Sequence, residues 1–198
     1  MELEDRIIQQ LHNSMEVNAV TIEQYTPLIA HAGELLLHCL VSESKIICCG
    51  NGASSSLGQY FTTTMMNRFK HERPGLPAIN LNSDGSTLSA ICEDSNFVDA
   101  MAKQIHALGQ PGDILLIMTP HGRSSSLIQA IQAAHNRDMT VIVLNGGDGG
   151  DITALLSPDE IEICIPSDDY NLVHHAQFLV LTALSDLIDY QLFGSDTQ

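Results

Sequence analysis

The sequence predicts an α/β protein whose parallel β-sheet carries helices on both faces. Two observations predict this class. Short apolar segments, which are typical of buried strands, alternate along the chain with longer segments in which apolar residues recur at helical spacing. The chain has 198 residues, of which 44% are hydrophobic and 16% charged. It can therefore bury a sizeable core within one globular domain spanning residues 1–198.

Residues 1–43 precede the first predicted strand and are expected to form two helices. Apolar residues follow mostly helical spacing over residues 2–20 and again over residues 22–41, where Pro27 interrupts the pattern near its start. We expect this N-terminal helical pair to pack on the doubly wound core of residues 44–198, or on a second subunit.

Strands alternate with helices in the rest of the chain. The predicted strands are residues 45–49, 78–81, 114–118, 140–144 and 160–165. The last of these alternates apolar and polar residues, as an edge strand does. The predicted helices are residues 54–69, 84–92, 97–108, 124–137 and 171–193. The final helix is apolar over most of its surface, so we expect it to be well buried.

Two of the predicted strands end in a glycine-containing turn that is followed by serines. The turns read G-N-G-A-S-S-S at 50–56 and T-P-H-G-R-S-S-S at 119–126. The first N–H groups of a helix are unpaired and carry partial positive charge, and serine hydroxyls add neutral donors, so such a turn can bind a phosphate. The ordinary alternative is a strand-to-helix turn with a serine N-cap.

Ligands of open parallel sheets bind outside the carboxyl ends of the strands, which is where both turns are expected. We therefore predict an anion site there. Its predicted residues are Asn51, Gly52, Ser54, Ser55, Thr119, His121 and Ser124. No G-K-[ST] follows the first turn, so it is not a Walker A loop.

Composition excludes several classes of partner. The net charge is −16, from 8 basic and 24 acidic residues, which disfavours direct binding to a nucleic-acid backbone. No apolar segment approaches the roughly 18 residues of a membrane helix. The acidic, amphipathic N-terminus is unlike a signal peptide, so a cytoplasmic protein is expected. The five cysteines are an odd number and contain no C-x-x-C pair, which favours reduced structural thiols.

Four segments resemble the sugar isomerase (SIS) domain family. They read C-G-N-G-A-S-S-S at 49–56, R-P-G-L-P-A-I at 73–79, P-G-D-I-L-L at 111–116 and D-G-G at 148–150. The similarity is greatest to the branch that contains phosphoheptose isomerases and the DnaA initiator-associating protein. The resemblance implies a flavodoxin-like, five-stranded sheet, a phosphosugar site between subunits, and a homotetramer.

The chain departs from the family at the positions that carry its chemistry. The family has a glutamate in the helix after the first turn, where this chain has Thr64, and a histidine in the last helix, where a gapless count gives Gln177. A slip of two residues would make His175 the substitute. A threonine hydroxyl is no base near neutral pH without activation. We therefore predict no catalytic residue, with His175 as the fallback.

The second turn also differs from the family's sequence pattern. The family's S-T-S-G-N-S is Thr119 to Ser124 in this chain. Pro120 removes a backbone donor, whereas His121 and Arg123 add positive character that could compensate for it, or face solvent. We expect phosphosugar or anion binding to be retained.

Two functions follow from the resemblance. The first is a non-catalytic, phosphosugar-binding-type protein that associates with the replication initiator DnaA, with Leu192 and Phe193 in the initiator contact. The alternative is an active phosphoheptose isomerase, which interconverts sedoheptulose 7-phosphate and a heptose phosphate. The missing glutamate and histidine favour the first function, whereas the Leu-Phe pair also occurs in related isomerases and does not discriminate.

Some family members hold zinc, and this chain is expected to lack it along with any other cofactor. The corresponding positions are Tyr60, Thr64 and Gln177, which are poor zinc ligands. His174 and His175 point about 100° apart on a helix and do not chelate well. We predict less than about one tenth of a zinc ion per chain after dialysis, because the ligand set is missing.

Overall fold

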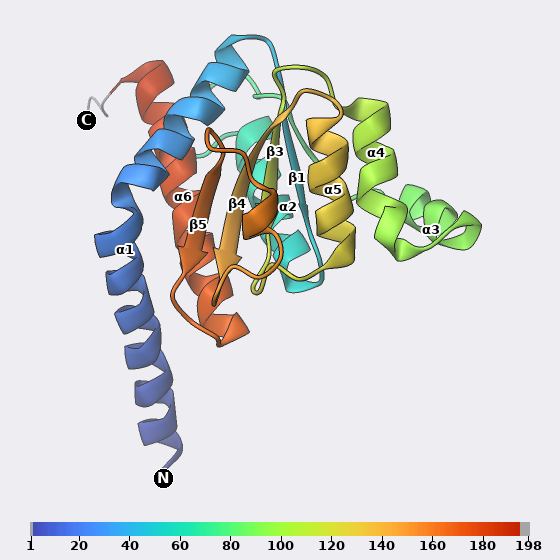
Figure 1. Ribbon diagram of the computed structural model, residues 1–198. Coiled ribbons are helices and arrows are strands. Elements are labelled where there is room, and N and C mark those ends of the chain that lie inside the picture. Colours follow the sequence, from blue (N-terminus) through green and yellow to red (C-terminus); the bar gives the residue numbers. More distant parts are fainter. Residues whose placement is uncertain (1, 195–198) are drawn as a thin grey trace.

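A computed structural model describes residues 2–194, and a five-stranded parallel sheet forms its centre (Figure 1). The strands are β1 (Ile46–Gly50), β2 (Ala78–Asn80), β3 (Ile114–Met118), β4 (Thr140–Gly146) and β5 (Ile161–Ile165). Their order is β2-β1-β3-β4-β5, and every neighbouring pair is parallel. This is the flavodoxin-type order, in which the winding reverses between β1 and β3. The predicted fold class is confirmed.

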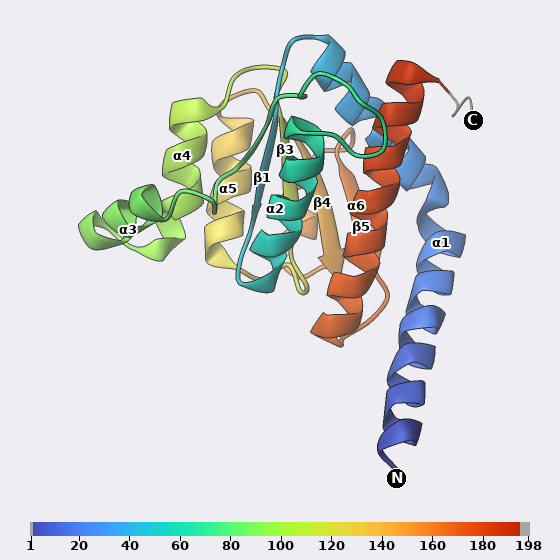
Figure 2. The ribbon, with the colours of Figure 1, turned by 180° about the vertical axis from the view of Figure 1, so that it is seen from behind.

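Helices cover both faces of the sheet (Figures 1 and 2). They are α1 (Leu3–Val41), α2 (Ala53–Met66), α3 (Gly85–Asp94), α4 (Ala100–Leu108), α5 (Ser125–His135) and α6 (Tyr170–Phe193), with short 3₁₀ helices η1 (Phe97–Asp99) and η2 (Thr153–Leu155). One face carries α4 and α5, and the other carries α2, α6 and the second half of α1. The starts of α2 and α6 lie at the lower edge of the sheet in Figure 1, where strands end.

The strands are apolar because both faces are covered. Adjacent Cys48 and Cys49 are fully buried in two different hydrophobic clusters, one on each face of the sheet, because successive side chains of a strand point to opposite faces. Burial raises the pKa of the Cys49 thiol to about 12, which keeps it protonated and unreactive. Strand β5 is an edge strand and alternates buried and half-buried residues, also as predicted.

Residues 3–41 form one continuous helix, so the predicted N-terminal helical pair was wrong. No break occurs near residue 21. Thr21 is buried, and its hydroxyl donates to the Val17 carbonyl oxygen at 2.8 Å, within the helix. Pro27 lies inside the helix and removes one backbone hydrogen bond without ending it. Beyond Pro27, packing of one stripe of α1 on the core holds the helix together. The stripe is Ala32, Leu36, Cys39 and Leu40.

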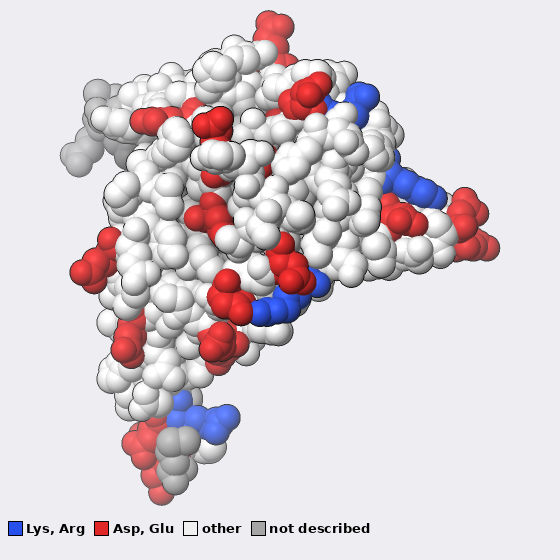
Figure 3. Space-filling model, viewed as in Figure 1, with Lys and Arg blue, Asp and Glu red and all other residues white. Residues whose placement is uncertain are grey.

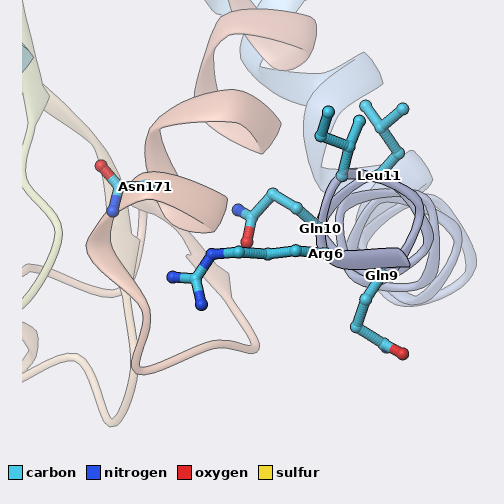
Figure 4. A pocket seen from close by; sticks show the side chains of 6 residues that line it. Arg6, Gln9, Gln10, Leu11 and Asn171 are labelled. Carbon is cyan, nitrogen blue, oxygen red and sulfur yellow. The ribbon is translucent and has the colours of Figure 1, made fainter. Parts of the chain in front are cut away.

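The first half of α1 extends past the sheet (Figure 1). Its exposed large apolar residues are Leu3, Ile7, Ile8, Leu11, Met15 and Ile22. A hollow of about 630 Å³ lies between this segment and Asn171 at the start of α6, with Arg6 and Gln10 projecting into it (Figure 4). None of the predicted phosphate-binding residues lines the hollow.

Helix α6 is buried along one side only. Leu181, Leu184 and Ile188 are fully buried, whereas Phe178 and Leu179 are exposed by 40% and 49%. The prediction of a well-buried helix therefore holds for one side of α6. Among the helices of residues 2–194, none is long and apolar enough to cross a membrane.

Candidate functional site

The two predicted anion-binding turns meet at the point where the sheet winding reverses. The side-chain amide of Asn51, which follows β1, donates to the hydroxyl of Ser126 in the first turn of α5, at 2.9 Å. Gly52 has a φ of +57°, which favours glycine, and Gly122 in the second turn has a φ of +61°. A Cβ at Gly122 would overlap the Gly149 carbonyl oxygen. Glycine therefore lets the second turn pack against the loop after β4.

Ser54 in the first turn of α2 contacts α6. Its side chain is fully buried, and its hydroxyl oxygen lies 3.0 Å from Nε2 of His174. Burial lowers the pKa of His174, and the neighbouring His175 lowers it further. The imidazole of His174 is therefore neutral at neutral pH. This pair joins the start of α2 to the start of α6.

Two of the other predicted hydroxyls bond within their own turns. Ser55 donates to the Gly52 carbonyl oxygen at 2.7 Å, and the Thr119 hydroxyl accepts from the N–H of Gly122 at 3.3 Å. Ser124 is the N-cap residue of α5, but its side chain makes no capping hydrogen bond. Ser54 and Thr119 are the buried hydroxyls of the set, and of these two Ser54 contacts α6, whereas Thr119 bonds within its own turn.

His121 and Arg123 line a polar depression of about 410 Å³ beside the second turn. Nδ1 of His121 accepts from the backbone N–H of Arg123 at 3.1 Å, and its ring lies 5.3 Å from the ring of Tyr170. The guanidinium of Arg123 pairs with the carboxylate of Asp148, from the loop after β4. The positive character expected from Arg123 is therefore offset by Asp148.

The positions of the family's glutamate and histidine are buried and hold neutral side chains. The Thr64 hydroxyl donates to the Phe61 carbonyl oxygen at 2.8 Å and lies 3.1 Å from the hydroxyl of Ser185 on α6. Nε2 of Gln177 lies 2.8 Å from the carbonyl oxygens of both Thr119 and Leu144. Neither side chain can act as a base, and both hold neighbouring elements together.

His175, the fallback residue, lies on the other side of α6. Its Nδ1 is 3.5 Å from the hydroxyl of Ser14 on α1, and within the described residues it makes no hydrogen bond to either turn. Sequence reasoning missed His174 instead. Residues 174, 181 and 185 form one stripe of a helix with 3.6 residues per turn, and residues 181 and 185 are buried. That periodicity could have shown which of the two histidines faces the core.

Two buried amide oxygens of the site have no hydrogen-bond partner. They are Oδ1 of Asn51 and Oε1 of Gln177, and in residues 2–194 no other buried side-chain nitrogen or oxygen lacks a partner. A buried acceptor without a donor is unfavourable. Both oxygens belong to side chains that contact the turns, Asn51 through Ser126 and Gln177 through the Thr119 carbonyl oxygen.

A zinc ion does not fit these residues. Tyr60 contacts Thr182 and Phe178. The Thr64 hydroxyl lies near that of Ser185, and the Gln177 amide donates to the Thr119 carbonyl oxygen. Within residues 2–194, no three His, Cys, Asp or Glu side chains lie close enough together to hold a metal. The zinc content stays a prediction that elemental analysis can test.

Comparison with known families identifies the class of protein to which this fold and the two joined turns belong. A family model described as SIS domain matches residues 10–146, and the chain belongs to this family. A phosphoheptose isomerase of Chromohalobacter salexigens is 45% identical over 195 residues, which are 98% of this chain and 99% of that protein. One of Alkalilimnicola ehrlichii is 42% identical over 194 residues, with 98% and 99% covered.

Solved structures agree with these relatives. A phosphoheptose isomerase from Francisella tularensis matches with a TM-score of 0.93 and 37% identity, over 96% of this chain and 99% of that one. A phosphoheptose isomerase from Neisseria gonorrhoeae matches with a TM-score of 0.89 and 34% identity, over 95% and 99%. The similarity therefore includes the whole sheet and both turns.

These relatives contradict the predicted function. The prediction of a non-catalytic factor associated with DnaA was wrong, because relatives that match 98% of the chain carry the name phosphoheptose isomerase. It gave too much weight to the residues at two positions, Thr64 and Gln177. Leu192 packs against the core and Phe193 is about half exposed at the end of α6. Their predicted contact with the initiator loses its basis.

Proposed function

We propose that this chain is a phosphosugar isomerase of the phosphoheptose type, acting on sedoheptulose 7-phosphate. The observation that carries the proposal is the end-to-end similarity to proteins named phosphoheptose isomerase, at 45% identity over 98% of the chain. Similarity of that extent supports a shared substrate class more strongly than differences at two positions oppose it. The chain would then be an enzyme, as its relatives are named.

The site offers the groups that a sugar phosphate requires. Two helix starts, those of α2 and α5, are held together by the bond between Asn51 and Ser126, and helix starts favour anions. The unpartnered amide oxygens of Asn51 and Gln177 can accept hydrogen bonds from sugar hydroxyls. Phosphate and hydroxyl groups would therefore both find partners.

Isomerisation moves a proton between two adjacent carbons, so it needs a group that accepts and returns a proton. Thr64 and Gln177 cannot supply it. Two imidazoles border the turns, His121 in the second turn and His174 beside Ser54. The proposal requires that one of them, or a residue of a neighbouring subunit, moves the proton.

Nuclear magnetic resonance of sedoheptulose 7-phosphate incubated with the protein tests the function. We expect an aldose phosphate to appear, and expect Ser54→Ala to slow its formation at least about tenfold, since a charge-assisted hydrogen bond is worth roughly 1.5–3 kcal/mol. Ser56→Ala is the matched control, because Ser56 is exposed and lies two positions after Ser54 in the same turn of α2. Folded wild-type protein that binds the sugar phosphate without converting it would contradict the enzyme.

A further inference from the structure

Asparagine is followed directly by glycine at two places in the chain, Asn51 and Asn145. An asparagine before glycine can lose its side-chain amide, because glycine has no Cβ to keep its backbone nitrogen away from the side-chain carbonyl carbon. Asparagine is accordingly among the thermolabile residues of proteins. The two pairs are the same dipeptide, so a difference between their reactivities would come from the fold.

The second pair lies inside the sheet. Asn145 and Gly146 are the last residues of β4, are paired with β5, and are buried. The amide nitrogen of Asn145 donates to the Gly149 carbonyl oxygen at 2.6 Å and to a carboxylate oxygen of Glu162 at 2.7 Å. A Cβ at Gly146 would lie only 2.7 Å from the Pro120 carbonyl oxygen. This backbone can therefore rotate only if the end of β4 unfolds locally.

The first pair lies in the open turn between β1 and α2. Gly52 is exposed, and nothing lies within 4 Å of the position that a Cβ would take. Within residues 2–194 its backbone N–H has no hydrogen-bond partner. The side chain of Asn51 is held through its nitrogen, which donates to Ser126, whereas its oxygen has no partner. The attacking nitrogen is therefore free, and the attacked amide is held at a single atom.

We propose that Asn51 deamidates spontaneously in the folded protein, restrained by its bond to Ser126, whereas Asn145 does not. The backbone nitrogen of Gly52 attacks Cγ of Asn51 and gives its proton to solvent. The new C–N bond closes a succinimide ring while the bond from Cγ to Nδ2 breaks, and the amide leaves as ammonia with a proton taken from water. A water molecule then opens the ring, which yields aspartate or isoaspartate. The reaction consumes water, releases ammonia and involves no change of oxidation state.

The product places a carboxylate where the two turns meet. A carboxylate is ionised at neutral pH and cannot donate, so the link to Ser126 would remain only with the serine hydroxyl as the donor. The first turn of α2 contains no acidic residue. The whole chain already carries a net charge of −16, and acidic side chains are spread over the face seen in Figure 3, where basic ones are few. Deamidation therefore makes this turn more repellent to anions.

Mass spectrometry of the aged wild-type protein tests the inference. The folded protein is incubated in mildly alkaline buffer, and its peptides are analysed for the replacement of an amide NH₂ by OH. We expect Asn51 to react at least about tenfold faster than Asn145, because Asn145 reacts only when the sheet opens locally. In concentrated urea the two asparagines should react at similar rates, since both are followed by glycine and no fold restrains them.

Ser126→Ala removes the restraint on the Asn51 amide. We expect it to accelerate deamidation at Asn51 by about two- to tenfold, the range that the loss of one hydrogen bond supplies. Ser125→Ala is the matched control, because Ser125 is the exposed neighbour of Ser126, and it should leave the rate unchanged.

Two results would overturn the inference: folded wild-type protein in which Asn51 reacts no faster than Asn145, or a rate at Asn51 that is the same in Ser126→Ala as in Ser125→Ala. Neither measurement depends on turnover. A protein that deamidates at Asn51 but has no isomerase activity would contradict the proposed function and leave this inference intact. An active isomerase whose Asn51 stays unmodified would do the reverse.

Discussion

Gln177 connects the ends of two strands through one side-chain amide. Its Nε2 lies within 2.8 Å of the carbonyl oxygens of Thr119 after β3 and Leu144 in β4, and the side chain is fully buried. These carbonyl groups lie where the ladder between the two strands ends. Gln177 stands where the family has a histidine, and in this chain it has a structural role of its own.

We expect Gln177→Met to lower the free energy of unfolding by about 1–3 kcal/mol, because the Thr119 carbonyl oxygen would lose the donor on Gln177. The Leu144 carbonyl oxygen would keep the N–H of Thr119 at 2.9 Å. Gln191→Met is the control, since Gln191 is exposed on the same helix and bonds only to the Leu187 carbonyl oxygen. Urea unfolding of both variants measures the difference. Equal stability of the two variants would show that the Gln177 amide contributes little.

At the scale of elements, a buried ion pair links helix α6 to the loop that follows α2. The guanidinium of Arg73 bonds the carboxylate of Asp189 at 2.7 Å, and both side chains are at most 2% exposed. Two further nitrogens of Arg73 donate to the carbonyl oxygens of Thr64 and Met65 at 2.8 Å. Arg73 thus closes the C-terminal end of α2, whose last carbonyl groups have no helical partner.

We expect Arg73→Met to destabilise the protein by about 3–5 kcal/mol, because the carboxylate of Asp189 would stay buried without its partner. Arg68→Met removes a charge from an exposed pair with Glu72 and should change stability by less than about 1 kcal/mol. Thermal unfolding at neutral pH compares them. A loss in Arg73→Met no larger than in Arg68→Met would contradict the role assigned to the buried pair.

At the scale of the whole molecule, one chain leaves apolar surface exposed. The first half of α1 and the outer side of α6 carry large apolar residues, among them Leu11, Met15 and Leu179, which are exposed by 60%, 68% and 49%. Exposed apolar surface of this extent is typical of an interaction site. The homotetramer expected from the family resemblance would cover such surfaces.

We expect light scattering at micromolar concentration to give the mass of about four chains. Leu11→Lys should shift the protein to smaller species, because a charge would be buried against a second subunit. Leu108→Lys is the control, since Leu108 is 40% exposed at the end of α4, on the opposite face of the sheet from α6. A wild-type monomer would contradict the predicted assembly.

The sequence by itself determined the sheet and the positions of the two turns. Strand segments such as 114–118 are apolar at every position, and glycines and serines follow them, so period and turn chemistry identify them locally. The family could also be identified from segments such as 49–56. The function could not be predicted from Thr64 and Gln177 alone, because the residues at two positions are weaker evidence of function than similarity over the whole chain.

Only the tertiary structure decided which residues meet. The apparent break near residue 21 disappears because Thr21 bonds within the helix and later residues of α1 pack on the core. The choice of His174 over His175 depends on the rotation of α6 against α2, and the neutralisation of Arg123 depends on a loop 25 residues away. Contacts between distant segments depend on how whole helices and strands pack against one another. The local periodicity of the sequence does not determine that packing.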